Sequence, residues 1–233
     1  MTTVIGATAL VTGGQRGLGR ALVQELLDAG AAKVYATART PVAESDPHIV
    51  PLPLEVTDGN SVAELARTAD DVSIVINNAG ISGGGPLSEV GVDEVRAVFE
   101  ANVFGALRVA QAFAPVLAAR GGGALVDIHS VLSWAAGAGV YGATKAALWS
   151  LTNSLRLELA PQGTQVVGVH LGYTDTDMTR ELDVVKNDPR DVARDVVAAL
   201  EKGESEVLAD EVSRAFKAAL SGPVEGLSLR PVA

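Results

Sequence analysis

A tyrosine and a lysine that could exchange protons, Tyr141 and Lys145, stand four residues apart in a stretch that continues as a helical pattern to Leu155. An i, i+4 spacing places both side chains on one face of a helix. Free tyrosine ionises near pH ~10, and an adjacent ammonium stabilises the phenolate and lowers that pKa. The pair could therefore serve as an acid–base catalyst. Taken alone, the same spacing more often marks a packed ring beside a solvated charge, so its meaning depends on the rest of the chain.

A glycine cluster near the N-terminus follows an apolar run at residues 4–11 and precedes a helical pattern of leucines. Glycines in a turn between a strand and a helix let the backbone approach a pyrophosphate, whose charge is met by free amides at the helix start. The spacing is Gly-x3-Gly-x-Gly and not the commoner Gly-x-Gly-x-x-Gly, and an ordinary glycine-rich turn is the alternative. We predict a dinucleotide-binding turn made of Gly13, Gln15, Arg16, Gly17, Leu18 and Gly19.

Two arginines bear on the type of dinucleotide. The second expected strand, residues 33–38, ends at Arg39, where a chain that binds NAD usually carries an acidic residue for the ribose hydroxyls. Arg39 and Arg16 could instead bind a 2′-phosphate with paired hydrogen bonds. The sequence therefore predicts NADP(H) as the cofactor, the alternative being that each arginine is a solvated surface charge.

Further polar residues follow other expected strands. Residues 72–76 lead to Asn77, Asn78, Ala79 and Gly80; residues 124–128 lead to His129 and Ser130; residues 165–171 lead to Gly172, Thr174 and Thr176. Strands that alternate with helices predict a parallel sheet, and ligands of such sheets bind at the carboxyl ends of the strands. A third strand at residues 49–54 is expected to be irregular because of Pro51 and Pro53. Asn102 interrupts a long helical segment at residues 91–119, which predicts a buried asparagine at a local distortion.

Composition sets the fold class. With 233 residues, 48% of them hydrophobic, the chain is expected to form a single α/β domain, a doubly wound parallel sheet of about seven strands with helices on both faces. Residues 224–233 are expected to be a tail. A net charge of −10 argues against a nucleic-acid partner. The chain has no cysteine and no segment that we expect to span a membrane, and we expect a cytoplasmic protein without a metal site.

These features together resemble the short-chain dehydrogenase/reductase family, in its simple single-domain, NADP-preferring form, over nearly the whole chain. The resemblance is carried by Thr12-Gly13-x3-Gly17-x-Gly19, Asn77-Asn78-Ala79-Gly80, Asn102, Ser130, Tyr141-x3-Lys145 and Gly172-x3-Thr176 in that order. It implies that Tyr141 gives the proton to a substrate carbonyl oxygen and that Ser130 hydrogen-bonds this oxygen. It also implies that Lys145 binds the nicotinamide ribose and lowers the pKa of Tyr141.

The remaining roles come from the same resemblance. Asn102 would hold a water in a proton relay, and Thr174 and Thr176 would fix the nicotinamide carboxamide beside Gly172. Glu55 and Val56 would face the adenine, and Asn78, Ala79 and Gly80 would line the cofactor site. The chain departs from the family pattern at Glu55, where Asp is usual, at Leu171, where Pro is usual, and in a short interval between Ser130 and Tyr141, which leaves Ser133 as a rival serine.

The sequence thus predicts an NADPH-dependent oxidoreductase that reduces a ketone or aldehyde to an alcohol. A dinucleotide-binding redox sensor without turnover is the alternative, and lyase or dehalogenase chemistry on the same fold is a more distant one. A homodimer or homotetramer is expected, with the helices of residues 91–119 and 141–160 as the dimer contact. An apolar substrate pocket is expected from Val131, Leu132, Trp134, Tyr173 and Met178.

Overall fold

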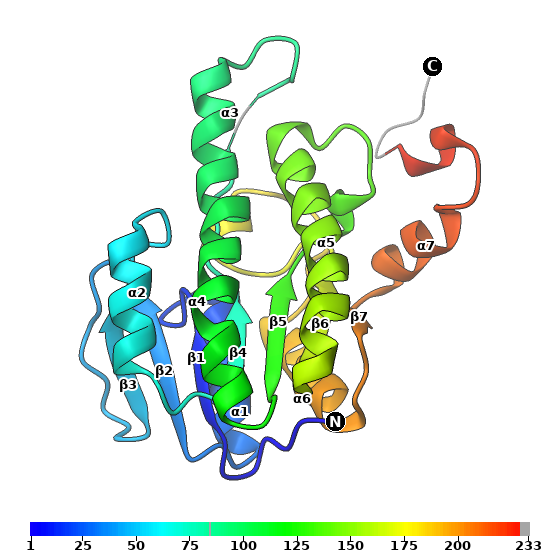
Figure 1. Cartoon of the computed structure of the whole chain (residues 1–233). Helices are drawn as coiled ribbons and strands as arrows, with labels where there is room; N and C mark the ends of the chain where they lie inside the picture. The colour runs from blue at the N-terminus through cyan, green and yellow to red at the C-terminus, as the bar shows by residue number, and fades with distance from the viewer. Residues whose placement is uncertain (84, 229–233) are drawn as a thin grey trace.

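Seven parallel strands form one sheet in the order β3-β2-β1-β4-β5-β6-β7 (Figure 1). The computed structural model of the chain describes residues 1–83 and 85–228. The strands are β1 (Thr8–Val11), β2 (Lys33–Ala38), β3 (Ile49–Pro53), β4 (Ile74–Asn77), β5 (Ala124–Ile128), β6 (Gln165–His170) and β7 (Glu206–Leu208). The predicted doubly wound sheet is confirmed.

Helices cover both faces of the sheet (Figure 1). Helices α1 and α6 pack against one face, and α2, α4 and α5 against the other. The helices are α1 (Gly17–Asp28), α2 (Gly59–Thr68), α3 (Val92–Phe99), α4 (Gly105–Ala119), α5 (Gly139–Leu159), α6 (Pro189–Lys202) and α7 (Glu211–Ala219). Short helical turns are η1 (Glu100–Phe104), η2 (Val131–Ser133), η3 (Ala160–Gln162), η4 (Asp177–Thr179) and η5 (Val224–Leu227).

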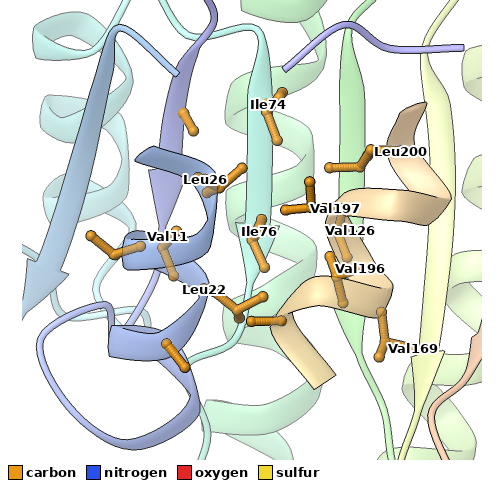
Figure 2. Close-up of a cluster of buried hydrophobic side chains, with 14 of the residues drawn as sticks. Val11, Leu22, Leu26, Ile74, Ile76, Val126, Val169, Val196, Val197 and Leu200 are labelled. Atoms are coloured by element: carbon orange, nitrogen blue, oxygen red, sulfur yellow. The ribbon is translucent and has the colours of Figure 1, made fainter. Parts of the chain in front are cut away.

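The alternation of side chains along each strand divides the apolar core into two layers. In β4, Ile74 and Ile76 belong to the layer under α1 and α6, whereas Val75 belongs to the layer under α2 and α4. Figure 2 shows the first layer, where Leu22 and Leu26 of α1 face the strands beside side chains of α6. Because successive strand residues point to opposite faces, the near-continuous apolar runs of the sequence are those of strands covered on both sides.

The third strand corrects the sequence prediction. It is regular, and Ile49–Pro53 pair with β2 at five successive positions. The two prolines are tolerated because β3 lies at the edge of the sheet, where a missing amide costs no hydrogen bond to a further strand.

The chain changes direction at β1, which positions the candidate site. From β1 the sheet extends to β2 and β3 on one side and to β4 on the other. The carboxyl ends of β1 and β4 therefore open a crevice, the place where doubly wound sheets bind their ligands. The glycine turn, Asn78 and Ser130 all follow strands that end at this edge.

The long helical segment contains the predicted distortion. Helices α3 and α4 are joined by η1, a stretch of π-helix in which Asn102 is 1% exposed. The whole segment Val92–Ala119 is, by length and composition, apolar enough to cross a membrane, which the sequence expectation did not anticipate. Half of its most apolar window is buried inside the protein, and core helices of soluble proteins pass the same test.

The end of the described chain is partly attached. After α7, the turn η5 brings Leu227 to Ala136, whose amide donates to the Leu227 carbonyl at 2.7 Å. Ala136 and Ser228 also form an isolated bridge. Residues 224–228 of the predicted tail are thus docked near the start of α5, and residues 229–233 lie outside the described part.

Candidate active site

The glycine turn forms a cradle without side chains. Gly13 and Gly17 have φ angles of +65° and +52°, which favour glycine. At Gly19 a Cβ would lie 2.1 Å from the Gly13 carbonyl oxygen and 2.7 Å from Asn78 Nδ2. A Cβ on Gly17 would meet the Thr176 side chain at 3.3 Å. The turn therefore brings together three predicted cofactor segments, from β1, β4 and β6, and leaves backbone amides uncovered at the start of α1.

Thr12 fastens β1 to the segment after β4. Its Oγ1 accepts hydrogen bonds from the amides of Asn78 at 3.0 Å and Ala79 at 2.9 Å. In return, Asn78 Nδ2 donates to the Thr12 carbonyl at 2.9 Å. These bonds fix Asn78, Ala79 and the adjoining Gly80 beside the glycine turn. Thr12 carried the family resemblance, but its role in holding Asn78 and Ala79 appears only in the structure.

Arg16 and Arg39 are both exposed next to the glycine turn, and no ion pair involves either within the described chain. The neighbouring loop is held by Gln15, which donates to the Val42 carbonyl at 2.6 Å and accepts from the Val42 amide at 2.9 Å. Glu44 pairs with Arg20 at 2.8 Å, and this pairing helps to lower the Glu44 pKa against the opposing effect of burial. Two cations thus remain available beside a fixed loop.

Tyr141 and Lys145 lie on α5 as predicted; Lys145 is buried and Tyr141 is half-buried. Lys145 Nζ donates to the Ile128 carbonyl at 2.7 Å and lies 5.6 Å from the centre of the Tyr141 ring. The ammonium is also near Gly80, since a Cβ there would be 3.9 Å from Nζ. The helix therefore places the pair where β5 ends and the segment after β4 begins.

The charges of this pair differ from the sequence expectation. Burial raises the pKa of Tyr141 to about 12 and lowers the pKa of Lys145 to about 8, the latter opposed by the charge of Asp127. The predicted lowering of the Tyr141 pKa by Lys145 is wrong for this structure, because the ammonium is directed to Ile128 and desolvation is the larger effect. Tyr141 is consequently a protonated phenol.

Asn102 links three segments of the site. Its Oδ1 accepts from the Ile81 amide at 2.8 Å, while its Nδ2 donates to the Ile81 carbonyl at 2.9 Å and to Thr144 Oγ1 at 3.1 Å. Thr144 in turn donates to the Tyr141 carbonyl at 2.7 Å. The π-helical turn therefore directs Asn102 inward to join the segment after β4 to the helix of Tyr141.

Ser130 and its rival Ser133 are both buried. Ser130 follows β5 and begins η2, with its Oγ accepting from the Leu132 amide at 3.1 Å. Gly142 lets η2 approach α5, because a Cβ there would lie 3.0 Å from the Leu132 carbonyl oxygen. This contact packs η2, which begins at Ser130, against α5. Ser133 Oγ has no hydrogen-bond partner among the described residues.

The segment after β6 is braced by Asp210, a residue that the sequence analysis missed. Asp210 accepts from the Gly172 amide at 2.5 Å and from Asn187 Nδ2 at 2.6 Å. Thr174 is buried, and its carbonyl accepts from Thr179 Oγ1 at 2.5 Å. A carboxylate that starts a helix looks like an ordinary cap in the sequence, and Asp210 does cap α7, so its second role gave no signal.

Glu55 and Val56, which the resemblance assigns to the adenine, follow β3. The Glu55 carboxylate accepts from the amide and the hydroxyl of Thr57, at 3.2 Å and 2.9 Å. Val56 packs on the start of α4, where a Cβ on Gly105 would come within 2.8 Å of it. The carboxylate thus stabilises its own loop in this structure.

The predicted apolar pocket is only partly present. Trp134 is buried and stacks on His170 at 3.9 Å, so it belongs to the packing beneath α7 and not to a pocket wall. Tyr173 and Met178 are 41% and 49% exposed. An open cleft of about 560 Å³ is lined by Asp175 and residues 186–190, none of which was expected to line the apolar pocket.

Known proteins are similar to this chain in sequence and in fold. The model of the short chain dehydrogenase family matches residues 7–186. An uncharacterized oxidoreductase of Staphylococcus aureus is 32% identical over 217 residues, which are 86% of this chain and 93% of that protein. A short-chain dehydrogenase of Talaromyces islandicus is 34% identical over 80% of this chain, which spans 66% of that longer protein.

A solved structure extends the similarity to three dimensions. The crystal structure of a short chain dehydrogenase from Burkholderia cenocepacia, in complex with NADP, is 36% identical and has a TM-score of 0.90. The match covers 97% of each chain. The family model covers most of the chain, and the glycine cradle, Ser130, Tyr141 and Lys145 occupy one edge of the sheet. The chain belongs to the short-chain dehydrogenase/reductase family of pyridine-nucleotide-dependent oxidoreductases.

Proposed function

We propose that the protein is an NADPH-dependent reductase of ketones or aldehydes. The observation that carries this proposal is the half-buried, protonated phenol of Tyr141, one helical turn from Lys145 and at the same sheet edge as the glycine cradle. A phenol that holds its proton at neutral pH is a proton donor, which is what a carbonyl oxygen needs as it becomes an alcohol.

The residues of the chain divide the work. When bound, the nicotinamide would supply the hydride. Ser130 would donate a hydrogen bond to the substrate oxygen and stabilise the charge that develops on it, while Tyr141 Oη transfers its proton to the same atom. Lys145, carrying its proton, would stabilise the phenolate that remains on Tyr141. Asn102 would keep Tyr141 in position through Thr144.

The preference for NADPH rests on Arg16 and Arg39. Both are exposed beside the turn, and a guanidinium matches a phosphate with paired hydrogen bonds. The cradle itself fits a dinucleotide, because no side chain caps the amides at the start of α1, where a pyrophosphate can bind. The relative from Burkholderia cenocepacia, which was solved with NADP, supports the same assignment.

The test is NADPH oxidation by the purified protein over a panel of ketones, aldehydes and diketones, with NADH in parallel. Tyr141→Phe should bind NADPH as the wild type does and lose turnover. Tyr35→Phe is the matched control, because Tyr35 Oη bonds Asp71 at the start of β2, at the opposite edge of the sheet. Its turnover should equal that of the wild type.

Two results would contradict the proposal. Substantial turnover in Tyr141→Phe would remove the proton donor from its role. Tight NADPH binding without turnover on any carbonyl would favour the redox-sensor alternative.

We also propose a homodimer through α4 and α5. Phe104 and Leu157 are 46% and 78% exposed in this region, although both are large and apolar. Sedimentation of the wild type and of Leu157→Glu would test this contact, with a monomer expected for the variant. The cytoplasmic location stays a prediction of the sequence.

A further inference from the structure

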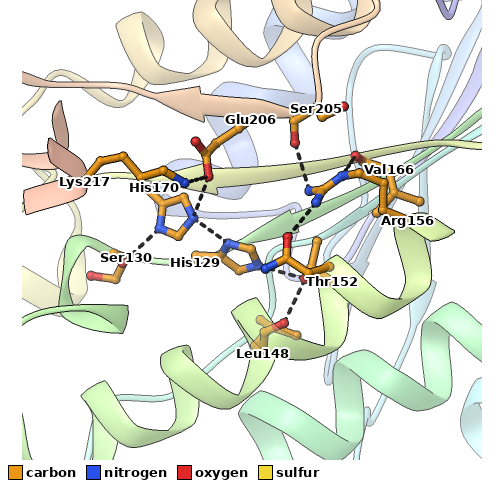
Figure 3. A network of polar contacts seen from close by, with 11 residues as sticks. His129, Ser130, Leu148, Thr152, Arg156, Val166, His170, Ser205, Glu206 and Lys217 are labelled. Carbon is orange, nitrogen blue, oxygen red and sulfur yellow. Dashed lines mark hydrogen bonds and ion pairs between the residues drawn. The ribbon is translucent and has the colours of Figure 1, made fainter. Parts of the chain in front are cut away.

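Behind Ser130 and Lys145, four buried side chains form an unbroken series of hydrogen bonds. Asp127 Oδ2 lies 2.6 Å from Thr152 Oγ1, and this hydroxyl lies 2.9 Å from His129 Nε2. His129 Nδ1 is 3.1 Å from His170 Nε2. All four residues are at most 1% exposed. Figure 3 shows the part of the series from Thr152 through the two histidines to the Ser130 backbone.

The fold places these side chains on one face of the sheet. Leu125 belongs to the layer under α2 and α4, and Asp127 and His129 follow it at two-residue intervals. On β6, Val166 belongs to the same layer, and Gly168 and His170 follow it at the same intervals. Gly168 leaves room for the imidazole, because a Cβ there would lie 2.8 Å from His129 Cε1.

The hydrogen atoms of this series can be counted. His170 Nδ1 is 3.3 Å from the Ser130 carbonyl, which only accepts, so this nitrogen carries a hydrogen. Each of the other three contacts needs one hydrogen as well, and the Leu148 carbonyl, 2.9 Å from Thr152 Oγ1, competes for the single Thr152 hydrogen. Thr152 supplies one of them, and each histidine has at least one. Ionised Asp127 with two neutral histidines would be one hydrogen short, so one additional proton must reside on Asp127, His129 or His170.

The surroundings decide among the three positions. Asn77 Nδ2 donates to Asp127 Oδ1 at 2.9 Å, which leaves Oδ2 free to carry the proton toward Thr152. With the proton there, all four residues are neutral, and no charge is buried. Burial raises the pKa of Asp127 and lowers the pKa of both histidines, in agreement with this position.

We propose that Asp127, Thr152, His129 and His170 form a proton-storing chain, in which one proton rests on Asp127 and moves to His170 when positive charge is held on Lys145. Asp127 O–H gives its proton to Thr152, the Thr152 proton passes to His129 Nε2, and the His129 Nδ1 proton passes to His170 Nε2. The net charge is conserved, and the result is a carboxylate at Asp127 and an imidazolium at His170.

Charged groups stand at both ends of the chain. Near His170, Glu206 Oε1 is 3.8 Å from Nε2 and favours the imidazolium, while Lys217, which pairs with Glu206 at 2.6 Å, and Arg156 oppose it (Figure 3). The charge of Lys145 also opposes the imidazolium, so its effect on the chain comes from favouring the Asp127 carboxylate. The Trp134 ring covers the other side of His170. Near Asp127, Lys145 donates to the carbonyl of the adjacent Ile128, and each charge favours that of the other. The chain thus makes Asp127 a positioning residue that acts through Lys145.

The first experiment needs no activity and uses the cofactor-free wild type. The protein has three histidines, so ¹⁵N-histidine NMR can report each ring, with His48→Gln assigning the exposed one. At pH 10, where Lys145 with its pKa of about 8 has lost its proton, His129 and His170 should both be neutral with the hydrogen on Nδ1. Below pH 8, where Lys145 holds its charge, His170 should become cationic and the His129 hydrogen should move to Nε2. A hydrogen on His129 Nε2, or a cationic histidine, at pH 10 would overturn the resting position on Asp127.

Two variants test the chain itself. Asp127→Asn keeps a donor toward Thr152 and an acceptor for Asn77, so at pH 10 the histidine signals should remain as in the wild type. Thr152→Val removes the link and should change the His129 signals. Thr68→Val is the matched control, because Thr68 also bonds the carbonyl four residues earlier in its helix but is exposed on α2. Equal effects of the two valine variants, or histidine signals in Asp127→Asn that differ from the wild type at pH 10, would refute the chain.

The link to Lys145 is read from its side-chain ¹³Cε signal as the pH is raised. Asp127→Asn cannot form the carboxylate, so Lys145 should titrate at a lower pH than in the wild type, and an unchanged midpoint would refute the coupling. The expected kinetic consequence is a shift of the pH profile of NADPH oxidation in the same direction. This kinetic prediction is the only one of the set that rests on the proposed function. If the histidine and lysine spectra are as expected but the protein has no turnover, the proposed reductase function is refuted and the proton-storing chain is not.

Discussion

Lys145 is a buried cation, so its ionisation should appear in the stability of the cofactor-free protein. Its pKa is about 8 in the folded state and lies near the free value of 10.5 in the unfolded state. Between these values the unfolded chain binds more protons, so stability rises with pH. Relative to Lys145→Met, the wild type should gain about 2–3 kcal/mol from pH 8 to pH 10. Urea unfolding of both proteins measures this difference, and parallel curves would contradict it.

Gly19 is a residue whose missing side chain defines the cradle. Gly19→Ala would place a Cβ 2.1 Å from the Gly13 carbonyl oxygen, against backbone that cannot move freely. We expect a loss of about 1–3 kcal/mol in the free energy of unfolding and weaker NADPH binding. Gly59→Ala is the control, because nothing lies within 4 Å of its Cβ and its helix should gain up to ~1 kcal/mol. Unfolding in urea and NADPH titration compare the two, and equal behaviour would refute the steric argument.

In the proposed function, Arg39 sets the preference for NADPH, and a change of charge at this residue tests that role. Arg39→Asp should lower the ratio of NADPH to NADH in kcat/KM by about 10–100-fold, the worth of a charge-assisted hydrogen bond to phosphate. Arg120→Asp makes the same change of charge at the exposed end of α4, away from the ligand edge, and should leave the ratio as it is. An unchanged ratio in Arg39→Asp would show that this arginine does not contact the 2′-phosphate.

At the scale of elements, the alternation of apolar runs with helical patterns was enough to predict the sheet, its parallel strands and the edge where the site lies. The pattern could not reveal what a side chain bonds at long range. Asp210 appears as a helix cap, and His129, His170 and Thr152 appear as isolated polar residues in apolar segments. Their roles depend on contacts between distant positions of the chain. His129 lies 23 positions from Thr152 and 41 from His170. Asp210 lies 38 positions from Gly172. Only the packed sheet brings these residues together.

The π-helical turn η1 is the element that aims Asn102 at Ile81 and Thr144. Asn102→Ala would leave the amide and carbonyl of Ile81 without these partners, at a cost of about 2 kcal/mol in the free energy of unfolding. Hydrogen exchange at the Ile81 amide should accelerate more than at amides of the central strands. Asn60→Ala, at an exposed position of α2, should stay within ~0.5 kcal/mol of the wild type. Unchanged Ile81 exchange in Asn102→Ala would argue against this clamp.

At the scale of the whole molecule, the crevice is assembled from segments after β1, β4, β5 and β6, so a dinucleotide that contacts all of them should stabilise the complete fold. At a concentration 100 times its Kd, a ligand adds about 2.7 kcal/mol. For a domain of this size, that corresponds to a rise in Tm of roughly 5–10 °C. NADPH should give this rise in the wild type and in Tyr141→Phe. In Gly19→Ala, the same concentration of NADPH should give a smaller rise. In the wild type, NADH should raise the Tm less than NADPH does. Because the readout is thermal unfolding, it separates cofactor binding from turnover. The absence of any shift with either nucleotide would mean that the four strand ends do not form a dinucleotide site, whatever the fate of the reductase assignment.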